Sequence, residues 1–212
     1  MAASFTHWKH WLLLLGYPLV GLFFLICEAL VPRVVHVMEW PEVDKLIPFV
    51  PWMVVPYVFW YLSIFFTFGW TGWHNPKEFQ KFCTFLYGAM ASTCVFYLLY
   101  PNGQQLRPPL SSLGSGWDYD TLRWIYGHDT PTNSNPSIHV INAIGVWVAL
   151  SRDKLLGARP WFYVLLALMS LSIIASTVLI KQHSLLDVFG GLAWAGVWYL
   201  VVYFRRPSAV TL

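Results

Sequence analysis

Residues 161–200 read WFYVLLALMSLSIIASTVLIKQHSLLDVFGGLAWAGVWYL, which is two apolar runs on either side of the polar segment 181–187. A helix needs about 20 mostly apolar residues to cross a hydrocarbon core that is roughly 30 Å thick. Each run approaches that length, and neither has the alternation of apolar and polar residues that a membrane β-barrel requires. The stretch therefore predicts two consecutive membrane-spanning helices joined by a short polar turn.

Similar apolar runs occur along the whole chain. Of its 212 residues, 57% are hydrophobic and only 11% are charged, whereas a soluble domain carries about 25% charged residues. The same composition excludes intrinsic disorder, which requires low hydrophobicity and high charge. The candidate spans lie near 11–30, 47–69, 80–100, 136–150, 161–181 and 184–204. We therefore predict an all-α polytopic membrane protein, a single membrane-embedded domain over residues 1–212 with six transmembrane helices in a bundle.

Two other interpretations of the composition fit the sequence less well. The first run has a basic flank at Lys9, as a signal peptide has, but no small-x-small cleavage site follows it, so we expect an uncleaved first span. The net charge of +3 is spread thinly over the loops, which argues against a nucleic-acid partner and for the lipid bilayer.

The basic residues predict which way the spans run. Six alternating spans place both termini on one side, together with the loops at 70–79 and 151–160. That side carries Lys9, Lys77, Lys81, Arg152, Lys154, Arg159, Arg205 and Arg206, and the other side carries Arg33, Lys45, Arg107, Arg123 and Lys181. Because cytoplasmic loops are enriched in Lys and Arg, we expect a multi-pass cell-membrane protein with cytoplasmic N- and C-termini and a long extracytoplasmic loop over 101–136.

Polar and ionisable residues near the spans gather in three segments, at 102–109, 133–139 and 181–187. By the span count, the end of span three, the start of span four and the turn between spans five and six all lie on the extracytoplasmic face. Ionisable groups at membrane depth are costly and mark a functional site by default. The sequence therefore predicts one site on that face.

The third segment contains His183 and Asp187, whose i, i+4 spacing puts them on one face of a helix that begins near Gln182. A carboxylate beside an imidazole fixes its tautomer and stabilises the cation that it can become. The alternative is a structural His–Asp pair at a helix start, where an acidic residue also suits the helix dipole.

The second segment has Pro136 as a suitable first helical residue, with Asn135 or Ser134 as its cap. The backbone amides of Ser137 and Ile138 would then point at an anion; the alternative is an ordinary helix cap. In the first segment Arg107 is suited to bidentate phosphate binding, and the alternative for it is an interfacial arginine whose stem lies along apolar surface.

Attack on a phosphate ester needs a nucleophile, an acid and donors that bind the phosphoryl oxygens. The three segments together offer two imidazoles (His139 and His183), a carboxylate, an anion-binding helix start and an arginine. Carboxylates for Mg²⁺ are scarce, since Asp187 is assigned to His183 and only Asp118, Asp120 and Asp129 remain in the loop. No zinc motif is present. We therefore expect chemistry without a metal ion or other cofactor.

These segments resemble the type-2 phosphatidic acid phosphatase superfamily of membrane lipid phosphatases and phosphotransferases. Its second block, Pro-Ser-x-His, is intact as residues 136–139; its third keeps Ser176, His183 and Asp187 at the right spacing; its first keeps Arg107 and Pro108. The resemblance covers roughly residues 80–204. At two positions where the family pattern has Lys or Arg, this sequence has Tyr100 and Thr177. The pattern without these two cations is similar to that of the branch that includes the inositol phosphorylceramide synthases.

The resemblance implies a role for each matching residue. His183 resembles the nucleophile that forms a phosphohistidine, Asp187 its orienting carboxylate, and His139 the acid that protonates the leaving group and then activates water or an alcohol. Arg107 and Ser137 would bind the phosphoryl oxygens. For the missing cations we suggest Lys181, with Gln104 or Gln105 as additional hydrogen-bond donors.

The leading hypothesis is a metal-independent hydrolase, a lipid phosphatase that removes a terminal phosphate from a membrane phospholipid or an isoprenoid pyrophosphate at the extracytoplasmic face. The second is a phosphotransferase that moves a phospho-head-group onto a lipid or sugar alcohol. The third, from a different class, is a non-catalytic lipid-binding or transport protein. The aromatic residues of the long loop fit either ordinary packing or a lipid contact; they are Trp117, Tyr119, Trp124 and Tyr126.

Overall fold

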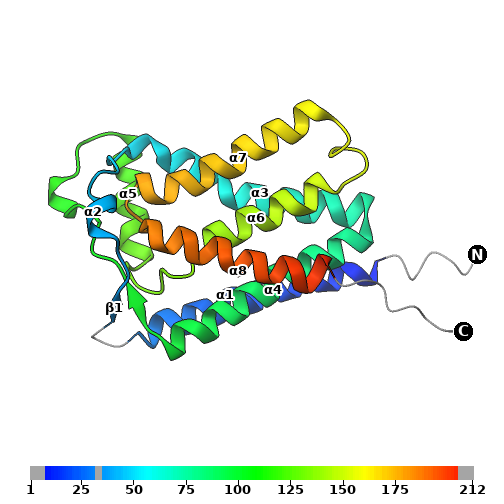
Figure 1. The fold of residues 1–212 in the computed structure, drawn as a ribbon, viewed down its shortest axis with the longest axis horizontal. Helices are drawn as coiled ribbons and strands as arrows, with labels where there is room; N and C mark the ends of the chain where they lie inside the picture. Colours follow the sequence, from blue (N-terminus) through cyan, green and yellow to red (C-terminus); the bar gives the residue numbers. More distant parts are fainter. Residues whose placement is uncertain (1–7, 32–34, 205–212) are drawn as a thin grey trace, which may run out of the picture.

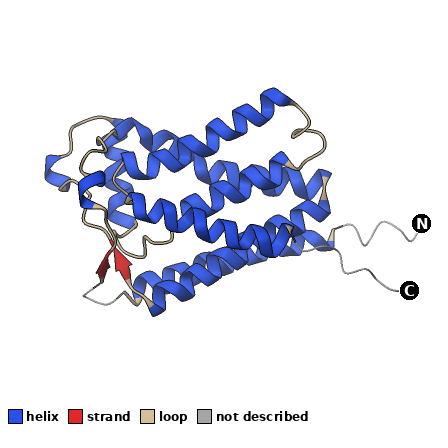
Figure 2. Ribbon diagram, in the orientation of Figure 1, coloured by secondary structure: helices blue, strands red, loops and turns tan. Residues whose placement is uncertain are grey.

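The computed structural model describes residues 8–31 and 35–204 and consists of long helices packed side by side (Figures 1 and 2). The long helices are α1 (Gly16–Ala29, preceded by the 3₁₀ helix η1, Lys9–Leu15), α3 (Val54–His74, preceded by η2, Pro51–Met53), α4 (Pro76–Leu99), α6 (Ile138–Ser151), α7 (Pro160–Leu179) and α8 (Leu185–Tyr203). The connections contain α2 (Pro41–Asp44), η3 (Leu110–Ser112), α5 (Trp117–His128) and a short parallel strand pair, β1 (His36–Val37) with β2 (Asn102–Gly103). The all-α class is therefore confirmed for the described residues.

Five segments among the described residues are long and apolar enough to cross a membrane: Lys9–Ala29, Pro51–His74, Pro76–Leu99, Pro160–Leu179 and Leu185–Tyr203. Many large apolar side chains on these helices are exposed, among them Leu19, Phe65, Leu168 and Leu200. Water disfavours so much exposed apolar surface, whereas lipid tails accept it. The helices therefore support a membrane protein.

The predicted fourth span is shorter than the other five. Helix α6 has 14 residues, and at about 1.5 Å per residue it spans less than a hydrocarbon core. It lies at the centre of the bundle and contacts α3, α4, α7 and α8. Nine of its residues are buried, so protein rather than lipid surrounds it. The prediction of exactly six spans is therefore not confirmed: among the described residues five helices have spanning length, and α6 is a short central helix.

The packing core lies between α3, α4, α6 and α7. It contains fully buried residues from each of these helices: Ile64, Phe82, Leu86, Val146 and Ile173. Near the start of α8, Gly191 lets that helix approach α6, because a Cβ at this position would lie 2.9 Å from the Ser137 carbonyl oxygen and 2.8 Å from the Val140 Cβ. This close approach brings the first turns of α6 and α8 together.

Two predicted loops differ from the structure. The loop expected at 70–79 is a single residue, Asn75, because its side chain accepts a hydrogen bond from the Glu78 N–H at 3.2 Å and caps α4 directly after α3 ends. The long loop at 101–136 is not irregular throughout, since α5 forms within it and begins with two acidic residues in its first turn.

The described chain starts and ends at the same end of the bundle, where η1 begins and α8 finishes, and the segment with α2, α5 and the strand pair lies at the opposite end (Figure 1). This is the arrangement expected for spans that alternate in direction. Of the basic residues used above to assign compartments, Arg33, Arg205 and Arg206 lie outside the described residues. The compartment that each end faces stays a prediction.

Candidate active site

The polar turn between α7 and α8 is built by backbone hydrogen bonds and a helix cap. Lys181 adopts a left-handed backbone with φ of 56°, and the N–H groups of Gln182 and His183 both donate to the Thr177 carbonyl, at 2.9 and 3.0 Å. Ser184 then caps α8 in a capping box with Asp187. The helix therefore begins at Leu185 and not near Gln182 as predicted, and His183 lies just before it.

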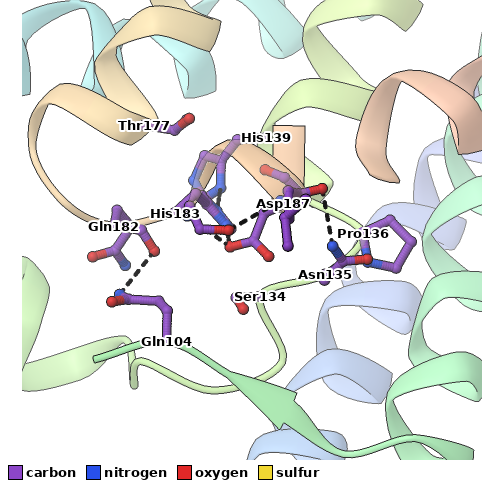
Figure 3. Close-up of polar contacts among 12 residues, drawn as sticks. Gln104, Ser134, Asn135, Pro136, His139, Thr177, Gln182, His183 and Asp187 are labelled. Atoms are coloured by element: carbon purple, nitrogen blue, oxygen red, sulfur yellow. Dashed lines mark hydrogen bonds and ion pairs between the residues drawn. The ribbon is translucent and has the colours of Figure 1, made fainter. Parts of the chain in front are cut away.

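This cap brings an imidazole and a carboxylate together. The Asp187 Oδ2 accepts a hydrogen bond from the Ser184 N–H at 3.0 Å and lies 3.2 Å from the His183 Nδ1 (Figure 3). The Asp187 side chain is fully buried, and its Oδ1 has no hydrogen-bond partner among the described residues. The predicted pairing of His183 with Asp187 is therefore present in the structure.

The second imidazole comes from the first turn of α6. The His139 Nδ1 lies 3.4 Å from the His183 Nε2, and the two ring centroids are 5.5 Å apart (Figure 3). On its other side the His139 ring packs against Tyr57 and Trp60 of α3, with centroid separations of 4.5 and 4.4 Å. An imidazole with an orienting carboxylate on one nitrogen and a second imidazole at the other is suited to nucleophilic and acid–base chemistry.

Helix α6 begins two residues later than predicted. Its cap is Ser137, whose Oγ accepts a hydrogen bond from the Val140 N–H at 3.4 Å, so Pro136 is not the first helical residue. The residues before it are held in place by hydrogen bonds, because the Asn135 Nδ2 donates to the Leu186 carbonyl at 3.0 Å and the Asn135 N–H donates to the Asn102 Oδ1 at 2.8 Å.

The Ser137 amide, which the sequence suggested would point at an anion, donates instead to the Asp187 carbonyl at 3.2 Å. This bond joins the start of α6 to the first turn of α8. Because His139 follows Ser137 by two residues and His183 precedes Asp187 by four, the same contact fixes the positions of both imidazoles. Ser137 itself is fully buried.

Arg107 binds carbonyl oxygens of the α5 connection. Its guanidinium donates to the Asp129 carbonyl at 2.7 Å and to the Thr130 carbonyl at 3.0 Å, and it lies 4.7 Å from the Tyr126 ring centroid. Burial lowers the pKa of Arg107, and the nearby Asp129 acts in the opposite direction. Its two terminal nitrogens thus donate within the loop rather than to the histidine pair, whereas its buried Nε has no hydrogen-bond partner among the described residues.

Lys181 is also bound within the protein. Its Nζ donates to the Asp44 carbonyl at 2.8 Å and to the Ile47 carbonyl at 2.6 Å, and burial lowers the pKa of this amine. The Gln104 Nε2 donates to the carbonyls of Lys181 and Gln182, at 3.1 and 3.2 Å, and so supports the same turn (Figure 3). These contacts link the turn before α8 to α2 and to the segment after α4.

The two positions at which the resembled pattern has cations face elsewhere. Tyr100 stacks on His36 with ring centroids 4.2 Å apart. Thr177 is buried, and its hydroxyl donates to the Ile174 carbonyl at 2.8 Å. Tyr and Thr carry no positive charge, and among the described residues neither side chain hydrogen-bonds to the histidine pair.

A cavity of about 910 Å³ leads from His139 and His183 to the surface between α1 and α3, beneath α5. Most of its lining is apolar or aromatic and includes Leu22, Leu25, Val58, Tyr61 and Trp124. The polar lining near the histidines comes from Asp129, Asn133, Ser134 and Gln182. Within residues 8–31 and 35–204, no Lys or Arg lines this cavity.

Sequence reasoning did not single out Asp129, Asn133, Ser134 or Gln182 as site residues. In the sequence Asp129 stands out only as a loop carboxylate, Ser134 as a candidate helix cap, Gln182 as an expected helix start and Asn133 as a member of a polar segment. The signal that was available is their proximity in sequence to the two histidine motifs. What was missing is the folded path of the long loop, which carries Asp129 back to Gln182.

Comparison with known protein families places most of this arrangement in one family. The model of the PAP2 superfamily matches residues 81–209, which include both imidazoles, Asp187 and the α5 connection. The comparisons with curated proteins and with solved structures found no match to the chain. Since the family model covers more than half of the sequence, the chain belongs to the PAP2 superfamily.

Proposed function

We propose that the protein is a membrane lipid phosphatase that cleaves a phosphate ester through a phosphohistidine intermediate. Membership of the PAP2 superfamily supports a phosphatase or phosphotransferase activity in general. The observation that carries the proposal is the row of three groups, Asp187, His183 and His139, with separations of 3.2 and 3.4 Å at the inner end of an apolar cavity.

The hydrogen bonds indicate which nitrogen would react. With a proton on Nδ1 shared with Asp187, His183 has a lone pair on Nε2, so the His139 Nδ1 must be the donor in the contact between the rings. The reacting state needs His139 as the imidazolium, with protons on both nitrogens. In the first step the His183 Nε2 forms a bond to phosphorus, the ester P–O bond breaks, and His139 gives one proton to the leaving oxygen and becomes the neutral imidazole. The carboxylate of Asp187 stabilises the charge that develops on His183.

In the second step His139, now without that proton, takes one from water as the water oxygen attacks phosphorus. The N–P bond breaks, inorganic phosphate leaves, and both rings return to their starting state.

We propose that no metal ion takes part, since the sequence offers few carboxylates and Asp187 is engaged with His183. Excess EDTA should therefore leave turnover unchanged, and loss of activity that a divalent ion restores would contradict this mechanism.

The cavity supports a lipid substrate. It is lined mostly by apolar side chains, and it extends from the histidine pair towards the outer surface between α1 and α3. Burying hydrocarbon there is favourable by about 0.8 kcal/mol for each methylene. We propose that the phosphate lies against His183 while an acyl or prenyl chain follows the cavity towards the bilayer. The positive-inside pattern favours the extracytoplasmic face of the cell membrane for this end of the bundle.

One observation favours a second candidate, a lipid head-group phosphotransferase of the kind found in the inositol phosphorylceramide synthase branch. A phosphomonoester carries about 1.5 to 2 negative charges near neutral pH, and Arg or Lys clamps usually bind them. No Lys or Arg of the described residues lines this cavity. A phosphodiester carries only one negative charge and needs less compensation.

The test is turnover of labelled lipids by the purified protein, with and without candidate acceptor alcohols. The panel contains phosphatidic acid, phosphatidylglycerophosphate and a polyprenyl pyrophosphate, and the products are free phosphate and any new phosphodiester. His183→Ala should abolish both products. His74→Ala, at the far end of α3 where the side chain contacts Trp70, is the matched control and should retain activity. Equal activity of the wild type and His183→Ala would overturn the proposal.

A further inference from the structure

Asp129 carries the one carboxylate among the described residues that line the cavity. It follows α5 directly, and its Oδ2 accepts hydrogen bonds from the Gln182 Nε2 and from the Tyr57 hydroxyl. Gln182 precedes His183, so this carboxylate lies beside the nucleophile of the proposed reaction. The Arg107 guanidinium binds the Asp129 backbone carbonyl and not its side chain.

The second oxygen of this carboxylate is available to a ligand. Two donors share Oδ2, whereas no described residue donates a hydrogen bond to Oδ1. Asp129 lines the cavity, and its partnerless Oδ1 is not one of the fully buried atoms, so this oxygen is accessible. A carboxylate has room for about four hydrogen bonds, and the observed contacts hold it in place while leaving an acceptor in the cavity.

The charge of Asp129 is unsuited to a bare phosphate. It would repel the dianion of a phosphomonoester, and no Lys or Arg among the described lining residues offsets it. An alcohol that is esterified to the phosphate changes this balance. It lowers the charge of the phosphate to one, and a hydroxyl or ammonium group on the alcohol offers the donor that a carboxylate binds.

We propose that Asp129 is a specificity-determining residue that accepts a hydrogen bond from a hydroxyl or ammonium group on the head-group alcohol of a phosphodiester lipid. The proposal rests on the second candidate function, the head-group phosphotransferase, in that the phosphate of a phosphodiester lies at His183. It favours substrates with a donor on the head group over phosphatidic acid. It also assigns the carboxylate to recognition and not to the bond-breaking step.

The test measures lipid binding in the His183→Ala variant, in which turnover does not interfere. Four dioleoyl lipids compete for the protein in detergent, and native mass spectrometry counts the bound species. Phosphatidylglycerol and phosphatidylethanolamine carry donors, phosphatidylmethanol is a phosphodiester without one, and phosphatidic acid is the phosphomonoester. We expect both donor lipids to bind about 10-fold or more tightly than phosphatidylmethanol, the effect of one hydrogen bond to a charged group.

Adding Asp129→Asn should abolish the preference for the donor lipids and should tighten the binding of phosphatidic acid, because the repulsion is removed. Asp118→Asn is the matched control, since Asp118 is partly exposed, lies outside the cavity lining and accepts a hydrogen bond from the neighbouring Tyr119 N–H, and it should retain the preference. If Asp129→Asn weakened all four lipids equally, Asp129 would be structural and the proposal wrong.

Absence of any preference in the His183→Ala protein would also overturn the proposal, and that comparison needs no change at Asp129. The proposed function fails separately. A wild-type protein that releases neither phosphate nor a transferred head group from any of these lipids would contradict the reaction, whereas a preserved binding preference would still support the role of Asp129.

Discussion

Asp187 contacts His183 through the same carboxylate oxygen that closes the N-terminal cap of α8. The Oδ2 lies 3.2 Å from the His183 Nδ1 and accepts the Ser184 N–H at 3.0 Å. The backbone that presents the imidazole and the group that orients it are therefore parts of one capping box. The rotamer of Asp187 cannot change without loss of the cap, so the cap itself orients the proposed nucleophile.

Replacing Asp187 with Asn should preserve the fold and slow turnover by roughly 100-fold or more, because an amide keeps an acceptor for the cap but does not stabilise the imidazolium. The rate of phosphate release and the thermal midpoint of the purified variant are the measurements. Ser184→Ala is the control. It removes the hydroxyl that accepts the Asp187 N–H and should cost about 1 kcal/mol of stability with a smaller effect on rate. A near wild-type rate for Asp187→Asn would refute the role of Asp187.

The sequence was sufficient for the parts of the site that depend on local pattern. Long apolar runs give the helices, and the direction of successive spans brings the segments at 102–109, 133–139 and 181–187 to one end. The four-residue spacing of His183 and Asp187 predicts their contact, although the predicted helix start near Gln182 is wrong. The helix does not begin before His183, and the contact arises from the cap at Ser184.

The parts that the sequence did not provide depend on long-range contacts of polar side chains. A lysine next to a catalytic motif suggests a phosphate ligand, but Lys181 donates to carbonyls of residues more than 130 positions earlier. Likewise the Ser137 amide is used by the Asp187 carbonyl. Neither partner can be inferred from spacing, because buried polar groups take whichever acceptor the packing brings near.

Replacing Lys181 with Met separates its two interpretations. Because its amine binds the Asp44 and Ile47 carbonyls, we expect a lower thermal midpoint and, in the protein that remains folded, a KM within about 3-fold of the wild type. Thermal unfolding gives the thermal midpoint, and steady-state kinetics over a series of lipid concentrations gives the KM. A KM that rises by more than 10-fold with an unchanged thermal midpoint would instead support phosphate binding by Lys181.

The stability of the protein should depend on pH through Asp129. Burial raises the pKa of its carboxyl, with Arg107 acting in the opposite direction. An Asp whose folded pKa exceeds the unfolded value of about 3.9 makes its full contribution to stability below that value and loses it as the pH rises through the folded pKa. The thermal midpoint of the wild type relative to Asp129→Asn should therefore rise as the pH falls from 7 towards 4. A difference that stays constant over this range would contradict the shift.

The cavity predicts a dependence on chain length that one glycine can test. Gly21 of α1 lines the cavity, and a Cβ at this position meets no atom within 4 Å, so Gly21→Phe should fold and place a ring where the substrate chain is proposed to lie. Displacing two methylenes costs about 1.6 kcal/mol, or roughly 10-fold in kcat/KM. We expect this loss with dioleoyl phosphatidic acid and less than about 3-fold with the dihexanoyl lipid, whose short chains do not reach α1. Gly196→Phe of α8 is the matched control, because it is equally open but lies outside the cavity. Equal losses for both lipids, or for both variants, would mean that the chain does not occupy the space between α1 and α3.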